Sequence, residues 1–105
     1  QRLREIAGGN AAFAHELMNL FVEDTAQRIA ALTEAIAGAD IAAVTTVAHT
    51  LKGSSGNIGA EPLRQAALAV EQHGRAGDLA TATTSLTRIE KELERLRESL
   101  AEMVL

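Results

Sequence analysis

The chain is 105 residues long, which is enough for one hydrophobic core and too short for two. Its 10 Lys and Arg residues against 14 Asp and Glu residues give a formal charge of −4, and only two residues are aromatic. Without a basic stripe or stacking rings the composition argues against nucleic acid as a partner, and the lack of cysteine excludes disulfides and thiolate chemistry.

The composition favours an all-α fold. Hydrophobic residues make up 47% of the chain, yet only Phe13 and Phe21 are aromatic and alanine is frequent. Alanine is the best helix former, whereas strands are rich in β-branched and aromatic residues. No run of 18 apolar residues predicts a membrane span, and no secretory leader is visible. We therefore expect a cytoplasmic helical domain without membrane contact of its own, which a longer parent chain can anchor to a membrane.

The first part of the chain predicts a short helix followed by a long one. Residues 1–6 form the short leading helix, which ends at Gly8 and Gly9, and Asn10 offers an N-cap for a helix over 11–37. In the long helix, apolar residues recur at steps of three and four and define the side that packs inward. They are Phe13, Leu17, Leu20, Phe21, Ile29, Leu32 and Ile36, with Thr25 at the one polar position of the series.

The next helix is predicted over 41–58. Gly38 ends the preceding helix, and Asp40 has the short polar side chain typical of an N-cap. The connection is so short that the two helices must be antiparallel neighbours.

Two further helices complete the prediction, over 62–74 and 79–104. Pro62 is typical of the first position of a helix, and Asp78 caps the last one. The inward residues of the first are Leu63, Ala66, Ala67 and Val70, and those of the second are Leu79, Ala82, Leu86, Ile89, Leu93, Leu96, Leu100 and Met103. The long last stripe is also compatible with a coiled-coil seam. Each of the three other amphipathic helices needs a neighbour against which it can bury its apolar stripe. We therefore expect an antiparallel four-helix bundle with the leading helix packed on it, as one domain over 1–105.

The stretch AHTLKGSSGNIGA, residues 48–60, holds the candidate functional residues. On a helical wheel of about 100° per residue, the apolar and small residues of this helix lie within roughly 60° of Val44. They are Val44, Val47, Ala48, Leu51, Ser55 and Ile58. The residues about 80–180° away are Thr45, His49, Lys52, Gly53 and Gly56. His49 is therefore expected to point into solvent, with Lys52 beside it.

Two glycines on the histidine's side of this helix call for an explanation. Gly53 and Gly56 each cost up to about 1 kcal/mol relative to alanine inside a helix. They either permit close packing of another helix or leave bare backbone for a partner, and their outward position favours the second. A neutral imidazole is a competent nucleophile near pH 7, and Lys52 can offset the charge of a phosphoryl group on His49. The stretch thus predicts a phosphoryl-accepting histidine in an open setting.

This stretch resembles the signature of histidine-containing phosphotransfer (Hpt) domains of two-component phosphorelays. It supplies the histidine, the Lys-Gly pair three and four residues later, the small residues after them and the later Gly-Ala. The resemblance implies a helical bundle in which His49 is the phosphorylated nucleophile. It takes the phosphoryl group from the aspartate of one response-regulator receiver domain and passes it to another.

The resemblance also implies roles for the residues around His49. Lys52 gives electrostatic support, and Glu71 orients the imidazole by holding one ring nitrogen, although an ordinary surface lysine and a solvated glutamate remain the alternatives. Four residues are assigned to the receiver-docking surface: Gly53, Gly56, Thr45 and Thr46.

No motif in the chain binds ATP, so the phosphoryl group must arrive from another protein or domain. We expect a phosphotransfer module, not an autonomous kinase, which also suits a segment of a hybrid histidine kinase. No cofactor or metal is expected on this chain, while Mg²⁺ is expected on the receiver. His15 and His73 have no second ligand at metal-binding spacing and are interpreted as incidental. The alternative function is a non-phosphorylated helical interaction or dimerisation module.

Overall fold

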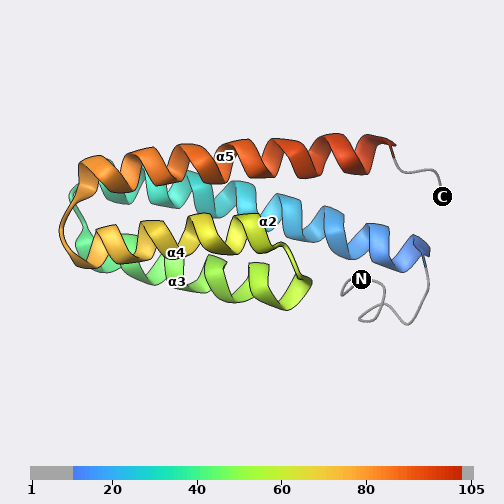
Figure 1. Ribbon diagram of the computed structural model, residues 1–105, viewed down its shortest axis with the longest axis horizontal. Helices are drawn as coiled ribbons and strands as arrows, with labels where there is room; N and C mark the ends of the chain where they lie inside the picture. Colours follow the sequence, from blue (N-terminus) through green and yellow to red (C-terminus); the bar gives the residue numbers. More distant parts are fainter. Residues whose placement is uncertain (1–10, 103–105) are drawn as a thin grey trace.

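A computed structural model describes residues 11–102, which form four helices joined by short turns, without strands (Figure 1). In chain order these helices are α2 (Ala11–Ala37), α3 (Ile41–Ile58), α4 (Glu61–Arg75) and α5 (Leu79–Glu102). The predicted all-α class is confirmed. The predicted helix over 1–6, its stop at Gly8 and Gly9, the Asn10 cap and Met103 lie outside the described residues.

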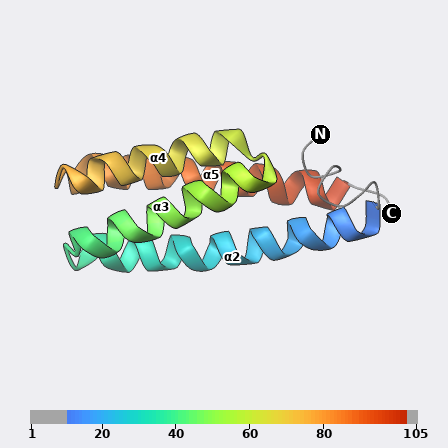
Figure 2. The same cartoon turned by 90° about the horizontal axis from the view of Figure 1, so that it is seen from below.

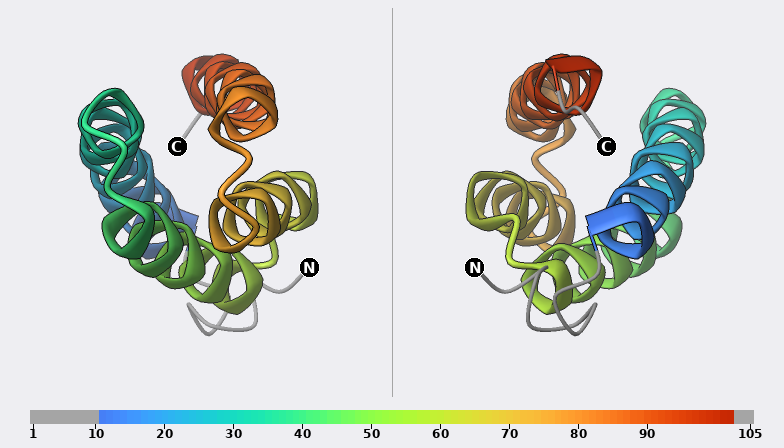
Figure 3. Two further views of the ribbon diagram at one scale, coloured as in Figure 1. Left: turned by 90° about the vertical axis from the view of Figure 1, so that its left-hand side faces the viewer. Right: turned by 90° about the vertical axis from the view of Figure 1, so that its right-hand side faces the viewer.

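The four helices enclose one core. Helix α2 packs on α3, α3 on α4 and α4 on α5, and α5 returns to α2, so the end-on views show a closed ring (Figure 3). This is the predicted antiparallel bundle. Helices α2 and α5 are longer than α3 and α4 and extend beyond them at one end (Figure 2). No helix between residues 11 and 102 combines the length and apolar character that crossing a membrane requires.

The predicted caps are present where α3 and α5 begin. Asp40 Oδ1 accepts a hydrogen bond from the Ala43 amide at 3.0 Å, and Asp78 Oδ1 accepts one from the Thr81 amide at 3.1 Å. These bonds satisfy amides that the first helical turn leaves without a partner. Both aspartates therefore define the ends of short turns, which hold neighbouring helices antiparallel.

The bounds of the fourth predicted helix differ slightly from the observed ones. Helix α4 spans Glu61–Arg75 instead of 62–74, so Pro62 is its second residue. Both of the first two positions tolerate proline, because neither amide has an acceptor within the helix. Before it, Gly59 ends α3 in the left-handed conformation at φ 80°, which glycine adopts without strain.

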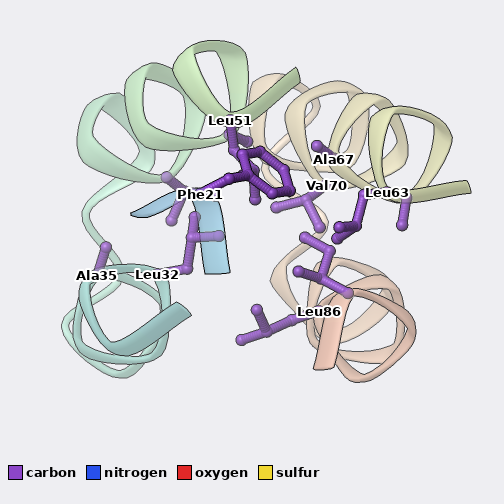
Figure 4. Close-up of a cluster of buried hydrophobic side chains, with 12 residues drawn as sticks. Phe21, Leu32, Ala35, Leu51, Leu63, Ala67, Val70 and Leu86 are labelled. Atoms are coloured by element: carbon purple, nitrogen blue, oxygen red, sulfur yellow. The ribbon is translucent and has the colours of Figure 1, made fainter. Parts of the chain in front are cut away.

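The core draws apolar side chains from all four helices, as Figure 4 shows. Its inward positions on α4 are those expected, and the α5 stripe is buried at Ala82, Leu86, Ile89, Leu93 and Leu100. Thr25 is fully buried too, in agreement with its place in the α2 series. Over the described residues the α5 stripe therefore packs within the bundle, as the prediction favoured over a coiled-coil seam.

Two residues assigned to the inner side of α2 are exposed. Phe13 is 46% exposed and Leu20 is 63% exposed, while Ala14 and Phe21 beside them are buried. Leu20 is one residue, or about 100° on the helix, away from Phe21, and both cannot face the core. Phe13 is in the first turn of α2, and the first part of this helix extends beyond α3 and α4 (Figure 2). The predicted series is thus correct for Phe21, Thr25 and Leu32 and wrong for Phe13 and Leu20.

Two leucines of α2 provide a direct test of this core. Leu32→Ala should destabilise the domain by about 2–5 kcal/mol, since Leu32 is fully buried and its truncation leaves a cavity. Leu20→Ala, the matched control, should change the free energy of unfolding by no more than about 0.5 kcal/mol. Urea titration followed by circular dichroism measures both. Equal losses from the two substitutions would contradict the described orientation of α2.

Candidate functional site

One flank of α3 faces α4, and four residues at helical spacing lie along it: Thr45, His49, Lys52 and Gly56. We call this row and the α4 residues opposite it the α3–α4 seam. Opposite Thr45 is Gly74, opposite His49 and Lys52 is Glu71, and opposite Gly56 is Arg64. The wheel placed the four α3 residues opposite or beside the core; the structure shows that they border α4.

His49 is the exposed member of the seam, with 61% of its side chain accessible. Its position follows from the register of α3: Ala48 and Leu51 face inward and are completely buried, which turns the two residues between them, His49 and Thr50, outward. The predicted outward direction of the imidazole therefore agrees with the structure.

Glu71 on α4 holds one side of the imidazole. Its Oε2 lies 2.8 Å from His49 Nδ1, and only 1% of the Glu71 side chain is exposed. Two cations contact the same carboxylate: Lys52 Nζ lies 2.8 Å from Oε1, and Arg75 Nη2 lies 2.9 Å from Oε2. A solvated Glu71, the simpler sequence interpretation, is wrong, because this carboxylate is buried among three partners.

These partners keep Glu71 ionised despite its burial. Burial by itself raises the pKa of the carboxyl group, but the contacts with Lys52 and His49, together with the charges of Lys52 and Arg75, outweigh it. The pKa of Glu71 is therefore lowered from its ordinary value of 4.5. At neutral pH the group is a carboxylate, which accepts hydrogen bonds and donates none.

The ionised Glu71 determines which nitrogen of His49 carries the proton. Because a carboxylate only accepts, the 2.8 Å contact requires Nδ1–H to be the donor. In the neutral ring, Nε2 then has no proton and keeps its lone pair. The arrangement thus combines a fixed ring orientation with a nucleophilic nitrogen on an exposed side chain.

Arg75 is a site residue that the sequence interpretation missed. It lies four residues after Glu71 on α4, and its side chain is 63% exposed. The Glu-to-Arg spacing of four residues was a usable signal, since such pairs meet on a helix surface. Lys52 and Arg75 together place two positive charges around one buried negative charge beside His49.

The two outward glycines have different surroundings. A Cβ at Gly53 would meet nothing within 4 Å, so this part of α3 is bare as expected. A Cβ at Gly56 would lie 3.3 Å from Cδ of Arg64, so the α4 side chain covers this backbone and Gly56 does not lie in open solvent. The wheel was wrong there because it could not say which flank meets α4.

The two threonines assigned to the docking surface also differ in their exposure. Thr46 is exposed, whereas Thr45 is partly buried against α4 and its hydroxyl donates to the Ile41 carbonyl at 2.9 Å. Of the four assigned residues, Thr46 and Gly53 therefore belong to the exposed surface of α3 next to His49.

The other histidines lie away from the seam. His15 lines a surface groove between α2 and α5, and no residue that lines this groove belongs to the seam. Its Nδ1 atom lies 3.1 Å from Asn19 Nδ2. His73 is partly buried near Asp78, whose pKa is lowered mainly by its hydrogen bonds with Thr81. In the described part of the chain, no three His, Cys, Asp or Glu side chains gather as metal ligands would.

Comparison with known proteins agrees with this arrangement. The sequence model of the Hpt domain family matches residues 16–99. The crystal structure of histidine-containing phosphotransfer protein B (HptB) from Pseudomonas aeruginosa PAO1 is similar with a TM-score of 0.87 and 27% sequence identity, over 96% of this chain and 88% of that chain. No curated protein sequence matches the chain.

The lowered pKa of Glu71 predicts a pH-dependent stability. A carboxyl group with a depressed folded-state pKa adds stability above its ordinary value of 4.5, and this contribution is lost as the pH falls through the lower folded value. Glu71→Gln should therefore cost about 1–3 kcal/mol at pH 7, and its difference from the wild type should shrink below pH 4.5. Urea titrations across this range measure it. Glu98→Gln, at an exposed position of α5, is the control, and a difference independent of pH for Glu71→Gln would contradict the assignment.

Proposed function

Because the chain belongs to the Hpt domain family and acts in histidine phosphotransfer within a phosphorelay, we propose that His49 is the residue that carries the phosphoryl group. The observation that supports this choice is the hydrogen bond between Glu71 and His49 Nδ1, at 2.8 Å, on an imidazole that is 61% exposed. Neither His15 nor His73 has a buried carboxylate partner of this kind among its described contacts.

The donor and acceptor in this proposal are receiver domains. Nε2 of His49 attacks the phosphorus of a receiver's aspartyl phosphate in line with the bond to the aspartate oxygen. The N–P bond forms, the P–O bond breaks and the aspartate leaves as a carboxylate. A second receiver takes the group by the reverse step, in which its aspartate attacks and His49 leaves. The receiver brings the Mg²⁺ that neutralises the transferring oxygens, and this chain supplies a positioned nucleophile.

The charges at the seam suit both states of the histidine. Before transfer, Glu71 is paired with Lys52 and Arg75, and its carboxylate stabilises the positive charge that develops on the ring as Nε2 attacks. After transfer, the phosphoryl group adds negative charge within reach of the same two cations. Lys52 is 26% exposed and Arg75 is 63% exposed, and both contact the carboxylate that holds His49.

A receiver needs close access to His49, and the outer row of α3 allows it. Gly53 is exposed and no atom would contact a Cβ placed there, and Thr46 is exposed in the turn before His49. We place the docking surface on this side of α3. Gly56 and Thr45 border it from the seam.

Substitution of the proposed nucleophile is the first test. His49→Gln should abolish acid-labile labelling when the domain is mixed with a phosphorylated receiver, because glutamine has no nucleophilic ring nitrogen. The fold should persist, since this side chain is mostly exposed. Mass spectrometry at neutral or alkaline pH locates the label. His15→Gln is the matched control and should keep wild-type labelling; label retained on His49→Gln would remove this residue from the mechanism.

The bare backbone at Gly53 is the second test. Gly53→Leu should leave helicity unchanged, because nothing lies within 4 Å of the new Cβ, yet it should slow transfer about tenfold or more by holding the receiver away from His49. Ala30→Leu, an exposed alanine of α2, controls for adding the same side chain elsewhere and should have no effect. Transfer rates from a labelled receiver measure both variants. Equal rates for Gly53→Leu and the wild type would show that this surface does not dock the receiver.

A further inference from the structure

Helix α4 has no room for a side chain at Gly74, where it packs against α3. A Cβ at this position would lie 2.8 Å from Cγ1 of Val44 and 3.4 Å from Oγ1 of Thr45. Carbon atoms in ordinary contact are about 3.5–4.0 Å apart, so even one methyl group does not fit. Gly74 and Val44 are both buried, and Val44 has no exposed surface at all. The two backbones therefore approach as closely as the Val44 side chain permits.

This contact lies one helical turn from the catalytic hydrogen bond. Gly74 follows Glu71 by three residues on α4, and Thr45 precedes His49 by four residues on α3. Because the helices are antiparallel neighbours, the Gly74 contact and the Glu71–His49 contact are successive rungs across the same seam. A change in the distance between the helices at the first rung is carried to the second through one turn of stiff helix.

We propose that Gly74 is a positioning residue, which lets α4 close onto α3 so that Glu71 reaches His49 and holds its Nδ1–H tautomer. This deepens the proposed function, because it names a determinant of the nucleophile's orientation outside the residues that touch the phosphoryl group. Gly74 acts only through Glu71. A glycine is otherwise unfavourable inside a helix, and here its lack of a side chain permits the close approach of α3 and α4.

A larger residue at position 74 would force the helices apart. Val44 cannot turn away from a new methyl group, because a β-branched side chain has one strongly preferred rotamer in a helix and this one is enclosed in the core. Relieving a 2.8 Å approach to an ordinary contact requires about 0.8 Å of movement. The same displacement at the next rung would stretch the 2.8 Å hydrogen bond of Glu71 and His49 beyond the normal range.

Gly74→Ala tests the proposal through the imidazole itself. Nitrogen-15 NMR of the ring reports which nitrogen carries the proton. The wild type should show the Nδ1–H tautomer, and Gly74→Ala should lose it. Labelling of His49 by a phosphorylated receiver should slow about tenfold. Circular dichroism checks that the variant remains helical.

A compensating substitution separates the proposed role from general damage. Val44→Ala removes Cγ1, the methyl group that a Cβ at position 74 would approach to 2.8 Å, so Val44→Ala/Gly74→Ala should recover the tautomer and most of the transfer rate. If Gly74→Ala fails to fold, this double variant decides: a folded protein with the native tautomer supports the proposal, and one without it overturns the proposal.

Two further variants serve as controls for the tautomer. Gly53→Ala makes the same chemical change in α3 without any contact within 4 Å, and it should keep the Nδ1–H form. Leu93→Ala weakens the core on α5 away from the seam and should lower the melting temperature while keeping the tautomer. Loss of the tautomer in Leu93→Ala, or its retention in Gly74→Ala, would overturn the proposal.

The NMR readout is independent of receivers. If wild-type protein shows the Nδ1–H tautomer but takes no label, the proposed function fails while the role of Gly74 can still be measured. If wild-type protein is labelled and Gly74→Ala keeps both tautomer and rate, the inference about Gly74 fails alone.

Discussion

A buried carboxylate imposes the strongest constraint on this structure. Glu71 is 1% exposed, and an unpaired charge in such a place would be too costly to remain ionised. It is met by His49 and Lys52 from α3 and by Arg75 from its own helix. The same contacts that keep Glu71 charged also join α3 to α4 and orient the imidazole, so stability and function share one cluster.

The side of α3 that packs in the core and the side that exposes His49 are different. The long helix α2 packs on α3 and the long helix α5 packs on α4, while α3 and α4 meet each other along the α3–α4 seam (Figures 1 and 3). At this seam 61% of the His49 side chain is exposed. Ala48, Leu51 and Val70 anchor this pair in the core without exposed surface. The packing of these residues therefore fixes the backbone position of His49. Its backbone belongs to a packed helix, and this fixed position suits the receiver docking that we propose.

The electrostatic arrangement explains why a glutamate is useful beside the histidine. The Glu71 carboxylate accepts a hydrogen bond from Nδ1–H and leaves the Nε2 lone pair free, and in the proposed transfer its negative charge stabilises the positive charge that develops on the ring. Left alone, this charge would also repel an incoming phosphoryl group. Lys52 and Arg75 offset this charge, and because their side chains are partly exposed they bring positive charge to the surface beside His49, where we propose that the phosphoryl group is bound.

The amino-acid sequence by itself determined the helices, their caps, most of the inward stripes and the presence of His49 and Lys52 on the outer part of α3. These are local properties, because periodicity and capping act within a few residues of the chain. The sequence did not show that Phe13 and Leu20 face outward, that Arg64 covers Gly56, that Arg75 joins the site or that Glu71 is buried. Only the tertiary structure decided these points, because they depend on which flank of each helix meets its neighbour and how closely the two backbones approach. The sequence of a single helix does not give the distance between its backbone and that of a neighbouring helix. At this seam, Val44 on α3 and Gly74 on α4 set that distance together.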